Sequence, residues 1–119
     1  KQTWREIEKK YMPSKNYDGH YYLESGGFWQ RQLHIYTSPF YYIDYTLAQI
    51  CAFQFWKKDR ENHEQAWQDY VHLCKLGGSK PFLELVEEAN LISPFEEGCV
   101  QSVVDEIENY LNSIDDKKL

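Results

Sequence analysis

Tyrosine is concentrated in one part of this sequence, beside a histidine. Residues 17–56 hold 13 of the 20 aromatic residues in the chain. Seven of the ten tyrosines lie there: Tyr17, Tyr21, Tyr22, Tyr36, Tyr41, Tyr42 and Tyr45. A buried tyrosine hydroxyl needs a hydrogen-bond partner, whereas phenylalanine fills a core without that cost. Together with His34, these side chains indicate either an apolar ligand cleft that meets polar groups or a hydrated, tyrosine-rich packing seam.

One long helix is expected to position most of these side chains. Ser38 and Pro39 are typical of the first positions of a helix, because serine accepts from a free backbone N–H and proline lacks one. We therefore expect a helix over residues 40–59, with Tyr42 and Tyr45 three apart on one face. This segment is apolar nearly all round, which is typical of a helix buried in a larger body or central to a bundle.

The rest of the chain also has a helical pattern. Apolar spacing predicts helices over residues 3–11, 28–36 and 61–76, the last ended by Gly77 and Gly78. A short helix is expected over residues 79–89, and a capping box of Ser93 and Glu96 is expected to open the final helix. Residues 12–27 have the composition of a loop. No segment alternates as a strand does, so we predict an all-α bundle of about five helices in a single domain or fragment, residues 1–119.

Composition excludes several classes of function. The chain is 42% hydrophobic with a net charge of −6, which is typical of a globular protein and argues against nucleic acid as a partner. Its longest nearly apolar run, residues 47–56, is about half of what a membrane span needs, and no signal segment is visible. Cys51, Cys74 and Cys99 lie far apart in the sequence without a C-x-x-C pattern, which favours reduced thiols in a cytoplasmic protein.

Patterns for metal binding and nucleophilic catalysis are incomplete in this sequence. His63 and Glu64 begin like the zinc-protease motif H-E-x-x-H, but Trp67 stands where the second histidine is needed. His20 and His34 have no carboxylate at a recognisable spacing. We therefore expect no metal ligands in this chain.

Residues 26–56 nevertheless resemble a known family. A histidine followed by FYYIxY and then by LAQxxAxQxW is similar to the C-terminal part of the catalytic domain of oligoendopeptidase F-type zinc metallopeptidases, which are relatives of thimet oligopeptidase. The similarity is strongest over residues 34–56 and extends more loosely over all 119 residues.

The resemblance implies a helical fold with two lobes around a deep channel, in which short peptides are cut. In that family, an H-E-x-x-H helix and a downstream glutamate bind zinc. The resemblance gives His34, Tyr42 and Tyr45 the roles of binding the substrate carbonyl and stabilising the oxyanion, with Tyr41 a rival to Tyr42. Residues 17–27 resemble a flexible glycine-containing loop that closes over bound peptide, which makes His20, Gly26 and Gly27 candidate substrate-binding residues.

This chain departs from the family in having no H-E-x-x-H motif. The resemblance thus implies zinc in a full-length parent, none liganded here, and a missing N-terminal part of the peptidase as partner. We expect this chain to be inactive alone and to self-associate through apolar surface near Tyr42, Phe53 and Trp56. Two alternatives remain: a non-catalytic helical module that binds a peptide or partner, and a purely structural helical domain.

Overall fold

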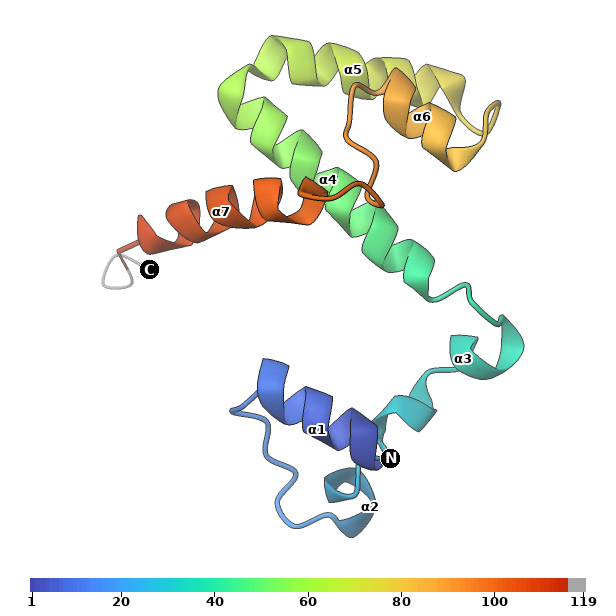
Figure 1. Ribbon diagram of the computed structural model, residues 1–119, viewed down its shortest axis with the longest axis vertical. Coiled ribbons are helices and arrows are strands. Elements are labelled where there is room, and N and C mark those ends of the chain that lie inside the picture. Colours follow the sequence, from blue (N-terminus) through green and yellow to red (C-terminus); the bar gives the residue numbers. More distant parts are fainter. Residues whose placement is uncertain (116–119) are drawn as a thin grey trace. The chain divides into compact units, whose positions relative to one another are not determined.

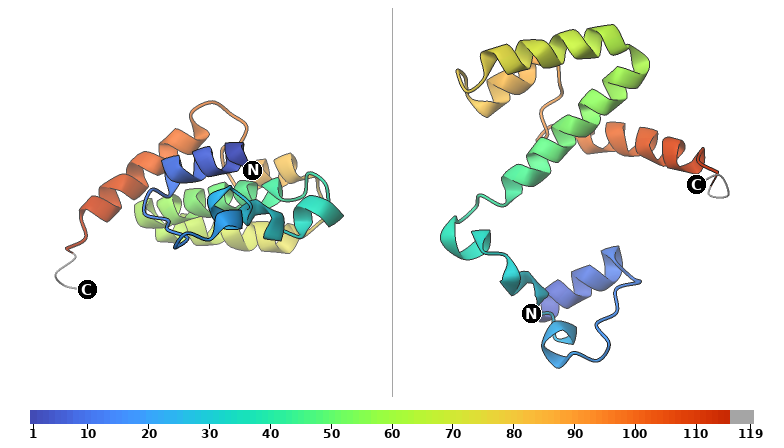
Figure 2. Two further views of the ribbon diagram at one scale, coloured as in Figure 1. Left: turned by 90° about the horizontal axis from the view of Figure 1, so that it is seen from below. Right: turned by 180° about the vertical axis from the view of Figure 1, so that it is seen from behind.

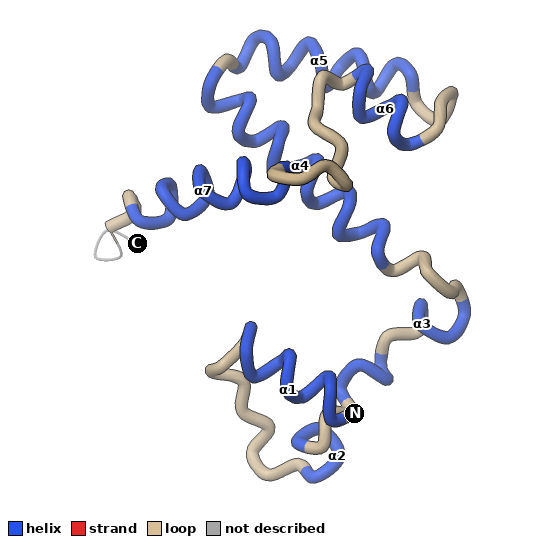
Figure 3. The backbone as a smooth tube through the Cα atoms, viewed as in Figure 1, coloured by secondary structure: helices blue, strands red, loops and turns tan. Residues whose placement is uncertain are grey.

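The protein is all-helical in the computed structural model, which describes residues 1–115 (Figure 1). Within that range, seven α-helices and one 3-10 helix are joined by loops and turns, and no strand occurs (Figure 3). Five of the α-helices have seven residues or more. The prediction of an all-α fold with about five helices is therefore confirmed. No helix in the described range is both long and apolar enough to span a membrane.

The chain divides into two compact units, Lys1–Ile43 and Asp44–Leu119. The N-terminal unit contains four short elements: α1 (Gln2–Tyr11), α2 (Tyr21–Glu24), the 3-10 helix η1 (Phe28–Arg31) and α3 (His34–Thr37). The C-terminal unit contains the longer helices: α4 (Ile43–Glu61), which begins at the boundary, α5 (His63–Leu76), α6 (Phe82–Glu88) and α7 (Cys99–Asn112).

A buried carboxylate holds the N-terminal unit together. Glu8 of α1 is 5% exposed, and its Oε1 accepts a hydrogen bond of 2.5 Å from the Tyr17 hydroxyl. Arg5 donates to the other oxygen of Glu8 at 3.0 Å and to Glu24 of α2 at 2.6 Å. Burying a charge is unfavourable unless it is paired and hydrogen-bonded, and here both conditions are met. These contacts tie the loop that follows α1 back onto that helix.

A buried glutamine joins α4 to the segment before α7. Gln54 is 6% exposed; its Nε2 donates to the Ile92 carbonyl at 2.9 Å, and the Ile92 N–H donates to its Oε1 at 2.8 Å. Helix α7 begins beside α4 (Figures 1 and 2), and its residues Cys99 and Val103 are buried. Lys57 of α4 also donates to the Ser102 carbonyl at 3.3 Å.

An ion pair joins α4, α5 and the end of α6. Lys58 lies 2.5 Å from buried Asp69, which also accepts from Gln65 and Asn90 at 3.0 Å each. The same ammonium group donates to the main-chain carbonyls of Ala89 at 3.3 Å and Asn90 at 3.0 Å. Helix α6 lies alongside α5 (Figure 2).

The predicted start of the long helix is wrong. Ser38 closes α3 instead, because its N–H donates to the His34 carbonyl at 3.0 Å. A turn follows, in which the Tyr41 N–H donates to the Ser38 carbonyl at 3.1 Å and Phe40 has a φ of 66°. That left-handed backbone is incompatible with a continuous helix. Helix α4 therefore begins only at Ile43, and Tyr42 does not share a helical face with Tyr45.

Two further helix predictions need correction. The Glu96 N–H donates to the Ser93 carbonyl at 2.9 Å, so the expected capping box is an isolated turn. Gly98, with a φ of 85°, separates it from α7. The helix expected over residues 28–36 is broken at Gln32, whose ψ of 98° is extended. The predicted helix over residues 61–76 is confirmed, because α5 ends at Gly77, whose N–H donates to the Leu73 carbonyl at 3.1 Å.

Candidate functional site

His34 lies against two tyrosine rings. Its ring centroid is 5.5 Å from that of Tyr42 and 5.9 Å from that of Tyr41. His34 is the first residue of α3 and is half-buried, whereas both tyrosines are exposed. The turn after α3 brings residues 41 and 42 back beside the start of that helix. Three of the predicted site residues therefore form one cluster, the His34 cluster, made of His34, Tyr41 and Tyr42.

The turn that builds the His34 cluster has a strained backbone. Phe40 is 94% exposed and adopts a positive φ, which is uncommon for a bulky residue. Such conformations cost free energy and are found where the surrounding structure imposes them, often at functional sites. The Pro39-Phe40 pair was interpreted from the sequence as the first turn of a helix, so this feature of the site was missed.

Tyr45 is the remaining candidate catalytic residue. It lies in the first turn of α4, within the C-terminal unit, and is 52% exposed. The choice among Tyr41, Tyr42 and Tyr45 for contact with an oxyanion, which the sequence left open, stays a prediction.

The candidate substrate-binding residues within the 17–27 segment have structural roles in the N-terminal unit. Exposed His20 caps α2, where its Nδ1 accepts from the Leu23 N–H at 3.5 Å. Gly26 and Gly27 are buried. A Cβ atom on Gly26, whose φ is 84°, would lie 2.0 Å from the Lys1 carbonyl oxygen, and one on Gly27 would lie 2.4 Å from the Tyr22 ring. The two glycines therefore allow close packing, and their contact with a peptide stays a prediction.

The anchor of this loop has perturbed acid–base properties. Burial favours a higher pKa for Glu8, but hydrogen bonds from Tyr17, Trp4 and Arg5 outweigh it, and the net effect lowers the pKa. Burial and the hydrogen bond to Glu8 raise the pKa of Tyr17 to about 12. At neutral pH, Glu8 is thus a carboxylate that accepts a hydrogen bond from the neutral phenol of Tyr17.

The described residues do not fit a zinc ion. Within residues 1–115, no group of three or more His, Cys, Asp or Glu side chains is placed to hold a metal. His63, which begins the incomplete motif, pairs with Asp59 at 2.6 Å on the surface of the protein. No catalytic step is therefore assigned to a metal bound by this part of the chain.

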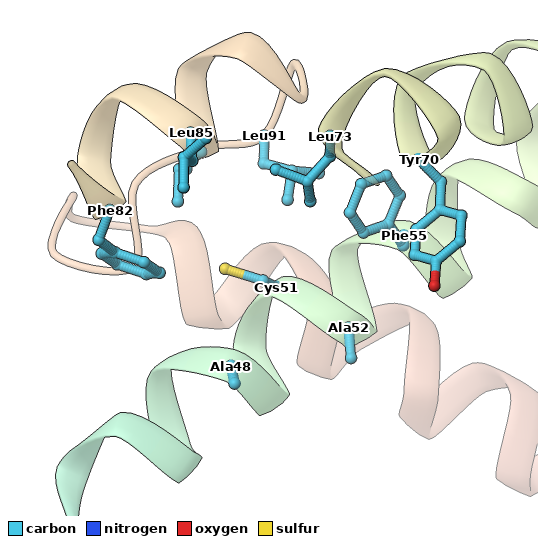
Figure 4. A pocket seen from close by; sticks show the side chains of 10 residues that line it. Ala48, Cys51, Ala52, Phe55, Tyr70, Leu73, Phe82, Leu85 and Leu91 are labelled. Carbon is cyan, nitrogen blue, oxygen red and sulfur yellow. The ribbon is translucent and has the colours of Figure 1, made fainter. Parts of the chain in front are cut away.

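The C-terminal unit also contains an apolar hollow that was not predicted from the sequence. It has a volume of about 470 Å³ and lies between α4, α5 and α6 (Figure 4). Ala48, Cys51 and Ala52 form its floor on α4, and larger apolar side chains from α5 and α6 form its walls. Ala48 and Ala52, two small residues four apart on α4, were the signal in the sequence that could have indicated it.

Solved structures of peptidases match this chain over nearly its whole length. A structure of PZ peptidase A with an inhibitor is 74% identical over 98% of the chain, with a TM-score of 0.86. A structure described as an oligoendopeptidase F is 66% identical over 98% of the chain, also with a TM-score of 0.86. Another structure described as an oligoendopeptidase F, from Bacillus anthracis strain Ames, is 59% identical over 98% of the chain, with a TM-score of 0.71. Comparison with protein-family models gives no match, and neither does comparison with curated proteins.

These similarities agree with the resemblance found in the sequence: over nearly its whole length, the chain is similar to a part of oligoendopeptidase F and PZ peptidase structures. It spans only 17–21% of the length of the relatives that it matches.

Proposed function

We propose that this chain is the C-terminal portion of a zinc-dependent oligoendopeptidase that hydrolyses short peptides. In this proposal it supplies His34, Tyr42 and Tyr45 for substrate binding and oxyanion stabilisation. The supporting observation is the packing of His34 against Tyr42, at 5.5 Å between ring centroids, in a chain 74% identical to PZ peptidase A.

The proposed chemistry rests on donors aimed at a developing negative charge. As water adds to a peptide carbonyl, its oxygen becomes an oxyanion. A phenol O–H or an imidazole N–H directed at that oxygen stabilises it more strongly in a channel that excludes water than in bulk solvent. Tyrosine also offers an apolar ring to substrate side chains, which suits a site that accepts peptides of varied sequence.

The metal of the parent peptidase is a separate part of the proposal. Zinc would polarise the carbonyl and lower the pKa of a bound water. Since the described residues gather no ligand set, its ligands would come from the missing N-terminal part. The chain alone would then lack both the metal and the base, and we expect it to be inactive.

The proposal places the parent enzyme in the cytoplasm. Cys51, Cys74 and Cys99 are all free thiols in the structure, which fits a reducing compartment.

The test uses the full-length parent peptidase, expressed from its complete open reading frame. Its hydrolysis of a short, fluorescence-quenched peptide is measured with zinc present. Tyr41→Phe, Tyr42→Phe and Tyr45→Phe are each compared with the parent, and Tyr36→Phe is the control. Tyr36 stacks on Trp29 with ring centroids 6.1 Å apart and is not part of the His34 cluster. Loss of an oxyanion donor typically lowers kcat by about 100-fold or more. We expect that loss for Tyr42→Phe or Tyr45→Phe with zinc content unchanged.

Three equally active variants would contradict the oxyanion role and would leave the cluster as packing. Zinc-dependent turnover by the purified 119-residue chain would contradict the proposal that it is inactive alone.

A further inference from the structure

The hollow in the C-terminal unit is open to solvent, and its lining is almost wholly apolar. Apolar depressions left open on the surface of a protein typically mark an interface or a ligand site. This hollow has a volume of about 470 Å³ and is lined by apolar residues of α4, α5, α6 and the segment after α6. Leu73, Leu85, Leu91 and Phe82 surround it, and the Cys51 sulfur points into it (Figure 4).

The chemistry of the lining favours protein side chains as the occupant. Sites for small molecules combine an apolar wall with a few precisely directed polar groups that orient the ligand. Here the Cys51 thiol and the Tyr70 hydroxyl are the polar side-chain groups among the lining residues. No lining residue carries a charge, so an occupant with a charged group would lose its hydration without gaining a partner.

The apolar surface continues beyond the mouth of the hollow. Tyr70 and Phe82, at its edge, are 46% and 41% exposed, and Trp67, one turn before Tyr70 on α5, is 58% exposed. Leu83 of α6 is 52% exposed. Exposed apolar side chains on the helices that line an apolar hollow typically mark an interface. The match to PZ peptidase A covers 21% of that chain, so about four fifths of its length is available to supply the covering segment.

We propose that apolar side chains from a part of the parent peptidase outside these 119 residues fill the hollow between α4, α5 and α6. The inference rests on the proposed function only in that the chain is a segment of a longer peptidase. It assigns the C-terminal unit a second task, independent of the His34 cluster: α4, α5 and α6 form a socket that holds the rest of the enzyme.

The thiol in the hollow allows a direct test. Cys51 lies inside, whereas Cys74 is exposed on α5. Both thiols are labelled with N-ethylmaleimide in the isolated chain and in the parent, and the rate at each is measured by mass spectrometry. We expect Cys51 to react about ten-fold or more slowly in the parent than in the isolated chain, because labelling then requires local opening. Cys74 is the internal control for reagent and folding.

Equal Cys51 rates in the two proteins would overturn the proposal, because the hollow would then be open in the parent. A Cys51 that is already protected in the isolated chain would overturn it as well, since the occupant would lie within the chain or in a second copy. Peptide hydrolysis by the parent is measured separately. A parent that protects Cys51 but cuts no peptide retains the socket and loses the proposed activity.

A variant that fills the hollow gives a second test, because it should shift the thermal midpoint in opposite directions in the isolated chain and in the parent. Cys51→Leu adds apolar volume inside the hollow, so it should raise the thermal midpoint of the isolated chain and lower that of the parent, where it competes with the inserted side chains. Cys74→Leu is the matched control outside the hollow. An increase in both proteins would show that the space is vacant in the parent and would overturn the proposal.

Discussion

Gln54 and Ile92 exchange two hydrogen bonds, with the side-chain amide of one pairing with both main-chain polar groups of the other. The two bonds are 2.9 Å and 2.8 Å long. A glutamine side chain presents an NH2 donor group and a carbonyl acceptor side by side, so it can pair with the N–H and the carbonyl of one residue in an irregular segment. The Gln54–Ile92 pair fixes the path of the chain between α6 and α7.

Replacing this glutamine should destabilise the C-terminal unit. Gln54→Leu keeps a side chain of similar size but leaves the Ile92 N–H and carbonyl without their partner, and a loss of that kind typically costs about 1–3 kcal/mol. The measurement is urea denaturation followed by tryptophan fluorescence. Gln49→Leu, at an exposed position of the same helix, is the control and should change the free energy of unfolding by less. Equal effects would show that the Gln54–Ile92 pair contributes nothing specific.

Tyr17 should make the N-terminal unit sensitive to alkali. Its pKa is raised from 10.0 to about 12 in the folded protein, so its contribution to stability is complete below pH 10 and is lost as the pH rises toward 12. Tyr17→Phe removes the titrating phenol. Between these pH values, the variant should therefore lose less stability than the unsubstituted chain. Tyr21→Phe, at a position 86% exposed, is the control. Identical alkaline profiles for the three proteins would contradict this assignment.

Glu8 should make the same unit sensitive to acid. Its pKa is lowered below the ordinary 4.5, so its contribution is present above that value and is lost as the pH falls through the lowered pKa. Glu8→Gln should therefore flatten the acid limb of a stability profile measured by circular dichroism. Glu6→Gln is the matched control, because Glu6 is exposed on the same helix and accepts a hydrogen bond of 2.9 Å from Gln2. An acid limb that persists in Glu8→Gln would assign the effect to other groups.

Gly26 and Gly19 separate two costs of adding a methyl group. Both have positive φ values, 84° and 76°, but only the Cβ of Gly26 would meet another atom, at 2.0 Å. Gly19→Ala should cost about 1–2 kcal/mol through backbone strain alone, and Gly26→Ala should cost clearly more. Thermal unfolding of both variants measures the difference. A Gly26→Ala cost no greater than that of Gly19→Ala would mean that the Lys1 end of α1 moves away freely.

Apolar exposure should make the isolated chain self-associate. Tyr42 and Phe53 are 44% and 37% exposed, and Val104 and Leu111 of α7 are also exposed. We expect the weight-average mass in sedimentation equilibrium to rise with protein concentration and to fall toward the monomer in mild denaturant that preserves helicity. A strictly monomeric chain across the whole concentration range would contradict this prediction.

The sequence predicted elements whose signals are local and strong. Helix α5 was predicted because its apolar period is regular and Gly77 is positioned to adopt the φ of 54° that ends it. The starts of α4 and α7 were wrong for one physical reason. Serine followed by proline, and serine three residues before glutamate, satisfy a helix start and an isolated turn equally well. The left-handed backbone at Phe40 and Gly98 decides between them, and neither serine pattern contains a signal for that conformation.

The candidate site was predictable in composition but not in geometry. His34 and the tyrosines were recognised from their types and from the family resemblance. The approach of Tyr41 and Tyr42 to His34 depends on the turn at Phe40, which a helical interpretation excludes. The role of Gln54 was also not apparent, because no local pattern pairs it with a main-chain segment 38 residues away.

The contacts of Lys58 indicate the order in which the helices of the C-terminal unit form. Helix α6 has seven residues, and a helix of that length does not persist by itself in water. The carbonyls of Ala89 and Asn90, which follow this helix, accept hydrogen bonds from the Lys58 ammonium group. That group comes from α4, 31 and 32 residues earlier. That ammonium group is in turn held by Asp69 of α5. We therefore expect α4 and α5 to join first and α6 to form late, so that its amides acquire protection in pulsed hydrogen exchange after those of the two longer helices.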